Sequence, residues 1–510
     1  MPPQSPDIAI TLQKAQAFHQ RRQLAQAEFL YRTILSRVPD HFDALHLLGV
    51  IEIQRQHYDA AIRLIAQALK ANPKSAPAQT SLGIALNGLK RHQEALASCD
   101  RALAINPDFA VAHNIRGNAL NDLKRHEEAL ASYDRVLAIN PGSAEALSDR
   151  SNALNDLRRH EEALASCNRA LGIRPSFAEA LNNRGNALNG LKRHEEALAS
   201  YDRTLALRPG SVDALNNRGA TLMWLQRYEE AAKDFHRLLG MDPDRDYARG
   251  RLLASRMHCC DWHSFDRDVA RVTADVRSGR RTILPFEFLA VSPSPADQLQ
   301  CAQIWVQDNC PASASPVWRG ERYGHDRIRI AYVSADFRDH AMANLTAGLF
   351  ELHDRKRFES IAVSYGPARP GDMRTRLEAA FDRFIDVRQQ SDRTVAGLLR
   401  EMAIDIAVDL NGFTTYARTG IFALRPAPIQ VNFLGYPGTM GADYIDYILA
   451  DRWVIPEEDQ RHYAEKVVYL PDSYQVNDRK RRIGEPTPSR AALGLPATGF
   501  VFCSFNSNYK

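Results

Sequence analysis

Three short stretches in the C-terminal half of the chain combine residue types that could do chemistry. The first, S-A-D-F-R-D-H, contains Asp336 and ends at His340, so it holds a carboxylate and an imidazole that can exchange protons. The second, D-L-N-G, contains Asn411, whose amide can both donate and accept hydrogen bonds. The third, L-G-Y-P-G-T-M-G at 434–441, is rich in glycine, which lets backbone N–H groups come close to a ligand. Together they indicate a polar binding site with a proton-transfer group.

Each stretch follows an apolar run that is typical of a buried strand: I-R-I-A-Y-V, I-D-I-A-V-D-L and I-Q-V-N-F-L. From Arg327 onward such runs alternate with helical stretches, which predicts a mostly parallel sheet covered on both faces. Ligands of such sheets bind beyond the carboxyl ends of the strands, so the three stretches should converge if their strands are parallel. The first stretch also opens a helix near Ala341, whose N-terminus favours an anion or a polarised oxygen.

Each of these signals also has a plainer interpretation. A glycine-rich turn after a strand is often only a tight connection, and a lone histidine is more often structural than functional. His340 lies on a loop at the ligand edge and is flanked by acids, so a structural and a functional role are equal alternatives for it.

The N-terminal half repeats with a period of 34 residues between 8 and 245, which predicts seven tetratricopeptide-type helix–turn–helix units. A small residue on the first helix and an alanine on the second let the paired helices approach closely, and a proline stops the second helix. One pair cannot bury its apolar face alone, so the units should stack into a curved solenoid with a concave groove. The prolines recur at 39, 73, 107, 141, 175, 209 and 243, and glycines stand at 49, 83, 117, 185 and 219, with Ser151 in the gap between 117 and 185.

Two polar features recur inside the repeats. Histidines at 92, 126, 160 and 194 precede acids, but adjacent units would hold them roughly 10 Å apart, too far to share an ion, so we interpret them as solvated turn residues and predict no metal site. Asparagines on the first helices could hold an extended peptide backbone without reading its sequence, although solvated surface residues are an equal alternative. The predicted groove set is Asn87, Asn118, Asn121, Asn152, Asn155, Asn186 and Asn189.

Composition narrows the class of protein. The chain has 510 residues, 25% of them charged, with a net charge of +4, and no basic block interleaved with aromatics, so we expect no nucleic-acid partner. Seven cysteines do not form a disulfide framework. The N-terminus has no signal-like pattern, and no apolar run approaches the roughly 20 residues of a membrane span. We therefore expect a cytoplasmic protein with no membrane span.

The run from Phe422 to Gly441, with I-R-I-A-Y-V-S-A-D-F at 328–337, D-L-N-G, and F-N-S-N-Y-K at the chain end, resembles the catalytic region of the O-GlcNAc transferase family. That family carries helical repeats ahead of its enzyme and includes the Spindly-type fucosyltransferases. The resemblance implies an α-solenoid followed by the Rossmann-like first lobe of a two-lobed GT-B-type glycosyltransferase. The expected organisation is repeats at 8–245, a helical connector at 246–325, an N-terminal catalytic lobe at 326–499, and the start of an absent second lobe at 500–510, hence a C-terminally truncated chain.

The same resemblance implies a chemistry. N-acetylglucosamine would pass from UDP-GlcNAc to a Ser or Thr of a polypeptide held in the repeat groove, with inversion and without a metal or other cofactor. His340 and Asp336 match positions proposed to relay the acceptor proton, and Lys510 matches a lysine that contacts the diphosphate. We hypothesise that His340 contacts the reaction centre and that Asp336 acts through water or by orientation. The predicted substrate-binding set is Leu434, Gly435, Tyr436, Pro437, Gly438, Thr439 and Asn411.

Two alternatives stay open at this point. The chain could be a peptide-binding scaffold with an incomplete, inactive catalytic half, or the donor could be GDP-fucose. Because related enzymes hold UDP largely in the second lobe, we expect the 510-residue chain alone to bind the nucleotide sugar weakly and to turn over poorly.

Overall fold

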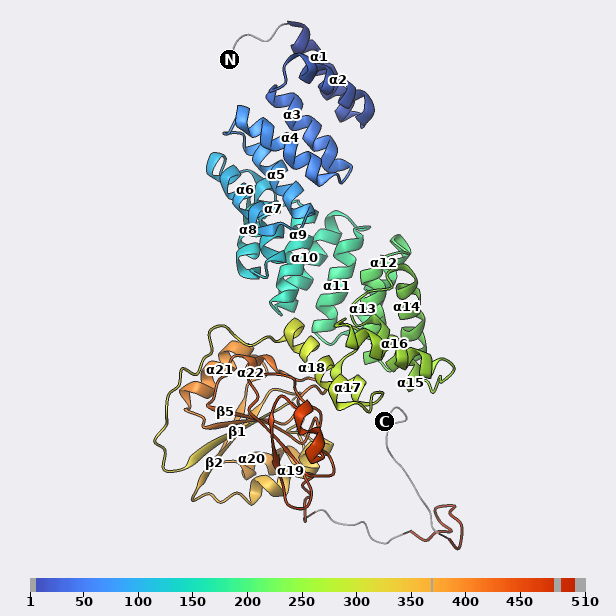
Figure 1. Ribbon diagram of the computed structural model, residues 1–510, viewed down its shortest axis with the longest axis vertical. Helices are drawn as coiled ribbons and strands as arrows, with labels where there is room; N and C mark the ends of the chain where they lie inside the picture. Colours follow the sequence, from blue (N-terminus) through green and yellow to red (C-terminus); the bar gives the residue numbers. More distant parts are fainter. Residues whose placement is uncertain (1–5, 368–369, 481–487, 500–510) are drawn as a thin grey trace. The chain divides into compact units, whose positions relative to one another are not determined.

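The computed structural model describes residues 6–367, 370–480 and 488–499. The chain forms two compact units, 1–227 and 228–510. The first unit consists of stacked helices, and the second carries a sheet (Figure 1). None of the helices that these described residues form combines the length and the apolar character needed to cross a membrane.

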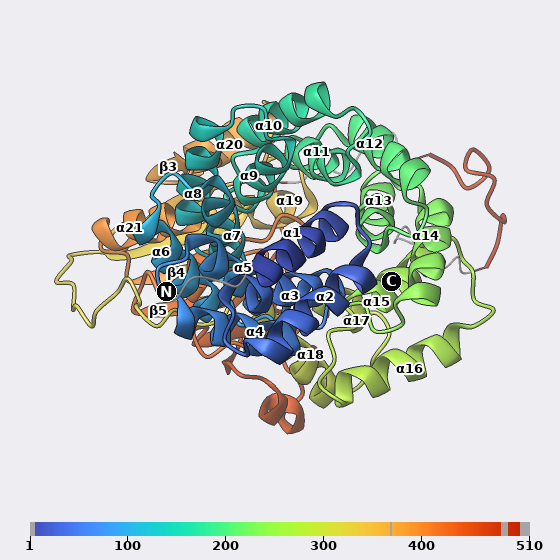
Figure 2. The ribbon, with the colours of Figure 1, turned by 90° about the horizontal axis from the view of Figure 1, so that it is seen from above.

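The helices of the first unit follow the 34-residue period. Consecutive helices pack in pairs, and each pair packs on the next, so the stack turns gradually along its length (Figures 1 and 2). The predicted helical repeat is therefore confirmed. Its helices are α1 (Pro6–Gln20), α2 (Leu24–Arg37), α3 (Phe42–Gln54), α4 (Tyr58–Ala71), α5 (Ala76–Gly88), α6 (His92–Ile105), α7 (Ala110–Asp122), α8 (His126–Ile139), α9 (Ala144–Asp156), α10 (His160–Ile173), α11 (Ala178–Gly190), α12 (His194–Leu207) and α13 (Val212–Trp224).

One left-handed residue sets the turn inside each repeat. It lies just beyond the first helix, has φ between 58° and 64°, and turns the chain toward the second helix. At the other end the proline acts as expected, since α6 stops at Ile105, two residues before Pro107. The left-handed residues are Arg22, Gln56, Lys90, Lys124, Arg158, Lys192 and Gln226.

The small residue on the first helix is matched to the side chain that it faces on the second. A Cβ added at Gly117 would lie 2.5 Å from the Tyr133 ring, and one at Gly185 would lie 2.4 Å from the Tyr201 ring. The exceptional Ser151 instead lies beside a small thiol, Cys167, and its hydroxyl donates to the Ser148 carbonyl oxygen at 2.6 Å. A thiol opposite therefore leaves room for a serine at this position without requiring one, because Gly83 also faces a cysteine, Cys99, whose Sγ would lie 2.8 Å from an added Cβ.

The expectation that the recurring histidines are solvated is wrong. Each begins a second helix, is half-buried, and places Nδ1 2.8–3.3 Å from the Oδ1 of an asparagine five residues earlier. In these four repeats the contact links the start of the second helix to the end of the first. The pairs are His92–Asn87, His126–Asn121, His160–Asn155 and His194–Asn189.

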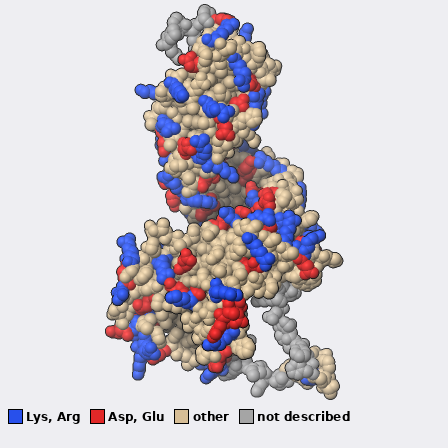
Figure 3. Space-filling model, in the orientation of Figure 1, with Lys and Arg blue, Asp and Glu red and all other residues tan. Residues whose placement is uncertain are grey.

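Charged side chains on the repeats form pairs that follow the same period. Arg116 contacts Asp100 and Arg150 contacts Asp134, at 2.8 and 2.7 Å. On the face shown in Figure 3, basic and acidic side chains are accordingly interspersed. Such exposed pairs contribute little to stability, on the order of 0–1 kcal/mol each, so apolar packing holds the stack together.

The second unit opens with helices and continues into the sheet. The predicted repeat region runs to 245, but the compact units divide between α13 and α14, and α14 packs against α15. The opening helices are α14 (Tyr228–Met241), α15 (Ala248–His258), α16 (Phe265–Arg277), α17 (Pro285–Leu289) and α18 (Pro295–Asn309).

The sheet has seven strands in the order β3-β2-β1-β4-β5-β6-β7, and every neighbouring pair is parallel. The chain thus adds β2 and β3 on one side of β1 and then adds β4 to β7 on the other side. The strands are β1 (Ile328–Ser334), β2 (Phe358–Ser364), β3 (Arg383–Asp386), β4 (Ile406–Asp409), β5 (Ile429–Phe433), β6 (Tyr447–Ala450) and β7 (Lys466–Tyr469).

Helices cover both faces of this sheet, as predicted. Alternate residues of β1 enter opposite cores: Ala331 and Val333 face one cluster, and Ile330 and Tyr332 face the other. In Figure 1, α21 and α22 lie on one side of the strands and α19 and α20 on the other. The covering elements are α19 (Ala341–Glu351), α20 (Asp372–Ala380), α21 (Asp392–Glu401) and α22 (Gly420–Ala423), with a 3-10 helix at Glu457–His462.

Candidate active site

The three polar stretches meet at one edge of the sheet. They follow β1, β4 and β5, which are neighbours and run parallel, so their carboxyl ends lie side by side. The strand order reverses between β1 and β4, and ligands of open α/β sheets bind in the crevice at such a reversal. The expected convergence is therefore present, and it occurs where the topology leaves space for a ligand.

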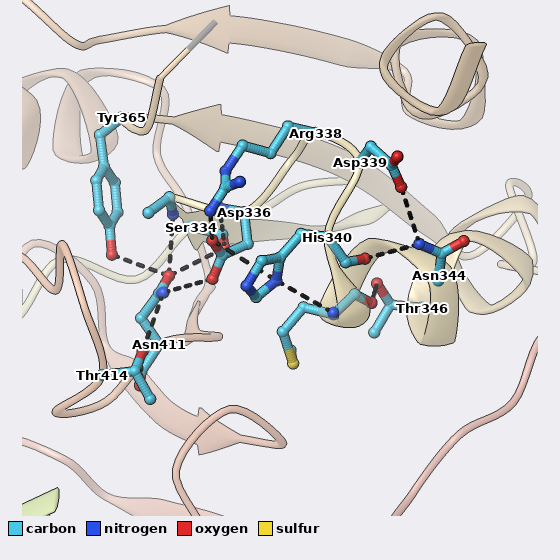
Figure 4. A network of polar contacts seen from close by, with 12 residues as sticks. Ser334, Asp336, Arg338, Asp339, His340, Asn344, Thr346, Tyr365, Asn411 and Thr414 are labelled. Carbon is cyan, nitrogen blue, oxygen red and sulfur yellow. Dashed lines mark hydrogen bonds and ion pairs between the residues drawn. The ribbon is translucent and has the colours of Figure 1, made fainter. Parts of the chain in front are cut away.

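Asn411 connects the loops at this edge (Figure 4). Its Oδ1 accepts hydrogen bonds from Ser334 Oγ, the Ala335 backbone N–H and the Tyr365 hydroxyl, at 3.0, 2.9 and 3.1 Å. Its Nδ2 donates to Asp336 Oδ2 at 2.9 Å. Asn411 is 0% exposed, so its side chain holds protein groups in place rather than facing solvent.

The turn that presents Asn411 depends on Asp409, the last residue of β4. Asp409 Oδ1 accepts the backbone N–H groups of Asn411 and Gly412 at 2.9 and 3.1 Å. Burial raises the pKa of the Asp409 carboxyl to about 6, and these two backbone hydrogen bonds act against that rise. The aspartate is therefore a structural part of the turn.

Asp336 is buried and paired with a cation. Arg338 Nη2 lies 3.2 Å from Asp336 Oδ1, whereas His340 Nδ1 lies 3.7 Å from the same oxygen, too far for a hydrogen bond (Figure 4). The structure therefore shows no direct hydrogen bond between Asp336 and His340. The predicted action of Asp336 through water or by orientation stays a prediction.

His340 is the N-cap of α19. Its Nδ1 accepts the backbone N–H of Met342 at 3.3 Å, and the helix begins at Ala341, where the sequence predicted it. Burial, and to a lesser extent Arg338, lowers the pKa of the His340 imidazole, although Asp336 and Asp339 act in the opposite direction. The side chain remains about a third exposed, so it can reach a ligand.

The glycine-rich turn packs directly on the D-L-N-G turn. A Cβ added at Gly435 would lie 2.0 Å from the Leu410 carbonyl oxygen, and one at Gly412 would lie 2.4 Å from the Tyr436 Cβ. Only glycine allows these two backbones to approach so closely. Leu434, just before, has φ 70° and is buried.

Several predicted substrate contacts already have partners inside the protein. The Tyr436 side chain is 2% exposed and packs edge-on against Phe413. Thr439 is also buried, and its hydroxyl donates to Glu465 Oε2 at 2.8 Å. Any contact of these two residues with a substrate would use the backbone. Gly435 and Pro437 are the least buried members of the turn, while Gly438 is buried.

Most of the groove asparagines also have internal partners. Asn118 and Asn186 accept the hydroxyls of Tyr133 and Tyr201, in addition to the four asparagines paired with histidines. Asn152 is the one member of the set for which the described residues supply no hydrogen-bond partner. The peptide-binding role of the set stays a prediction.

Lys510 lies outside the described residues, as does the whole segment 500–510, so the structure places neither. Within the described ranges, no group of three or more His, Cys, Asp or Glu side chains is arranged to hold a metal ion.

Three residues near the site were not singled out from the sequence. Arg338 stands inside the first stretch, but its type alone does not show that it pairs with Asp336. Tyr365 follows β2, and its place directly after a strand was the available signal. Glu465, which also accepts the Met440 backbone N–H, gave no signal, since only the fold brings it to the turn.

Comparison with known families gives matches in both halves of the chain. Residues 317–485 match the family model described as glycosyl transferase family 41. This segment is similar to glycosyl transferase family 41. Tetratricopeptide repeat models match residues 12–62, 47–110, 110–143, 144–177 and 178–211, so the resemblance to the O-GlcNAc transferase family is confirmed.

Curated relatives extend the family 41 match. The chain is 33% identical over 282 residues to the probable UDP-N-acetylglucosamine–peptide N-acetylglucosaminyltransferase SEC of Arabidopsis thaliana, covering 51% of this chain and 29% of that protein. It is 29% identical over 242 residues to the UDP-N-acetylglucosamine–peptide N-acetylglucosaminyltransferase of Caenorhabditis elegans, covering 44% and 21%. The chain thus spans less than a third of the length of these relatives.

Among solved structures, a variant of the Thermobaculum terrenum O-GlcNAc transferase is similar, with 26% identity and a TM-score of 0.42. The similarity covers 65% of this chain and 58% of that one.

Proposed function

We propose that this protein transfers N-acetylglucosamine from UDP-GlcNAc to Ser or Thr hydroxyls of polypeptides. The observation that carries the proposal is the meeting of Asp336, His340, Asn411 and the 434–441 turn at the strand reversal of a sheet that matches the family model. The names of the relatives, which specify UDP-N-acetylglucosamine and peptide, supply the donor and the acceptor class.

The proposed reaction is a single displacement with inversion, and no metal takes part in it. The hydroxyl oxygen attacks C1 of the sugar and loses its proton to water, the bond from C1 to the diphosphate oxygen breaks, and its electron pair stays on the UDP. The negative charge that grows on the leaving group needs donors and cations nearby. The N-terminus of α19 lies at this edge and suits an anion. The predicted contact of Lys510 with the diphosphate would add a cation.

The acceptor polypeptide would be held by the tetratricopeptide unit. Because most of the groove asparagines are tied to tyrosines and histidines, we propose that they present a fixed polar surface rather than mobile side chains. Asn152, on α9, would then be the member best able to form a new hydrogen bond with a peptide.

The test is transfer of radiolabelled sugar from UDP-GlcNAc, or from GDP-fucose in a parallel arm, to acceptor protein. The 510-residue chain and any longer product of its gene are compared, each with and without His340→Ala. We expect transfer from UDP-GlcNAc and a loss of at least about tenfold in the variant. Transfer only from GDP-fucose would show that the donor is GDP-fucose and not UDP-GlcNAc. If no form of the protein uses either donor, the proposed function becomes that of a peptide-binding scaffold and not of an enzyme.

A further inference from the structure

The two ring nitrogens of His340 are not equivalent in this structure. The Met342 backbone N–H can only donate, so Nδ1, which it contacts at 3.3 Å, must carry a lone pair. A neutral imidazole with an unprotonated Nδ1 carries its proton on Nε2. While the cap is in place, neither ring nitrogen can accept a proton, because one lone pair is occupied and the other nitrogen is already protonated.

The surroundings also disfavour a charged imidazolium. The groups that face the ring are Asp336, Arg338 and Asp339. The one buried carboxylate among them, Asp336, is paired with Arg338 through Oδ1 and with Asn411 through Oδ2, and it makes no hydrogen bond to the ring. The positive end of α19 lies against the same side chain. A neutral histidine at a helix N-terminus is suited to polarise an oxygen rather than to remove a proton.

From these contacts we propose that His340 acts as a neutral hydrogen-bond donor through Nε2–H, directed at an oxygen of the leaving diphosphate, and not as the general base. This inference rests on the proposed function. When the bond from C1 to the diphosphate oxygen breaks, its electron pair stays on that oxygen, and Nε2–H stabilises the charge. The proton of the attacking hydroxyl passes to water.

Two amide variants separate the roles of the ring nitrogens. In His340→Gln the amide nitrogen can reach the place of Nε2, so the donor is kept and the cap is lost. In His340→Asn the amide oxygen can reach the place of Nδ1, so the cap is kept and the donor is lost. Neither amide can act as a base. His340→Ala, which lacks both functions, is the reference.

The turnover number for transfer from UDP-GlcNAc, measured on the longest active form, decides among three outcomes. A donor role predicts that His340→Gln retains turnover within about tenfold of the wild type, while His340→Asn falls about 100-fold, as His340→Ala does. A general-base role predicts that all three variants fall equally. A purely structural cap predicts that His340→Asn is close to the wild type. Either of the last two results overturns the proposal.

An independent measurement needs no transfer reaction. Nitrogen-15 NMR of histidine-labelled protein reports which ring nitrogen of His340 carries the proton, with His340→Asn used to assign the signals. We expect an unprotonated Nδ1 and a protonated Nε2 at pH 7. The opposite tautomer, or an imidazolium, would refute the inference even if the enzyme transfers sugar. The expected tautomer in a protein that transfers no sugar would leave the hydrogen-bond arrangement of His340 standing and would refute the proposed function, and with it the role at the leaving group.

Discussion

At the scale of single residues, Asn411 is a predicted substrate contact whose side chain is buried among protein groups. The sequence placed it among the substrate-binding residues, and that role stays a prediction. In the structure its Oδ1 accepts three hydrogen bonds and its Nδ2 donates two, to Asp336 and to Thr414 Oγ1 at 3.2 Å. An amide has no capacity beyond these bonds. Its evident effect is to orient Asp336.

Replacing Asn411 by Asp tests this orientation with little change of shape. The new carboxylate keeps an acceptor for the groups that Oδ1 binds, but it places a second negative charge about 2.9 Å from Asp336 Oδ2. Two carboxylates so close share one proton, and the higher pKa of the pair is raised. We expect transfer activity at least about tenfold below the wild type at pH 8.

The sign of the pH dependence follows from that raised pKa. Above it both carboxylates are charged and repel, so stability and activity fall; as the pH drops through it, the shared proton restores a hydrogen bond and both recover. Activity and thermal melting between pH 5 and 9 measure the effect. Thr414→Val removes the other partner of the same amide nitrogen and should leave the pH profile unchanged. A flat profile for the Asp variant would show that the contact with Asp336 does not matter.

At the scale of elements, helix pairing in the repeats depends on matched side-chain size. Gly117 and Gly185 face tyrosines, and Ser151 faces a cysteine. These pairs lie in the same positions of their repeats, and Gly83 faces Cys99 in another repeat, so the chain itself contains both a glycine and a serine opposite a thiol. Sequence comparison between repeats shows the exchange, but the contact that explains it exists only in the folded pair.

The second prediction exchanges the residues of the Gly117–Tyr133 pair for those of the Ser151–Cys167 pair. Gly117→Ser puts a Cβ about 2.5 Å from the Tyr133 ring and should destabilise the repeat unit by about 1–3 kcal/mol. Tyr133→Cys removes the ring and its hydrogen bond to Asn118, and should cost about 3 kcal/mol or more.

The double variant recreates the Ser151–Cys167 pair. It should therefore be at least about 1 kcal/mol more stable than the sum of the two single changes, a coupling that urea unfolding followed by circular dichroism can measure. Simple additivity would mean that the glycine pattern has another cause.

At the scale of the whole molecule, the compact units do not divide at the end of a repeat. The first unit ends with α13, the first helix of the seventh repeat, and this helix packs on α11 and α12. Its Thr221 hydroxyl accepts from Asn189 Nδ2 at 2.5 Å, and its Ala214, Leu215 and Leu222 are buried. Helix α13 therefore covers the apolar end of six complete repeats.

The third prediction compares two fragments. Residues 1–227 retain α13, whereas residues 1–210 end after six complete repeats and leave the surfaces of α11 and α12 that α13 covers open to water. We expect the longer fragment to melt at least about 5 °C higher by circular dichroism, because it keeps that apolar surface buried. Equal melting temperatures would show that α13 does not act as a cap. An unfolded longer fragment would show that the division at 227 is not a folding boundary.

The sequence alone determined the features that depend on spacing along the chain. The 34-residue period set the helix pairs, the apolar runs set the parallel sheet, and strand order then brought the stretches after β1, β4 and β5 together. Periodicity is a local property, whereas the order and mutual direction of the strands, which bring the three stretches together, belong to the tertiary structure. Only the tertiary structure decided which polar groups are already satisfied. The Asn411 amide is satisfied by the segments after β1 and β2 and by its own turn, His340 Nδ1 by a helix end, and the repeat histidines by asparagines. Burial and hydrogen-bond pairing depend on residues distant in sequence, and residue types do not reveal them.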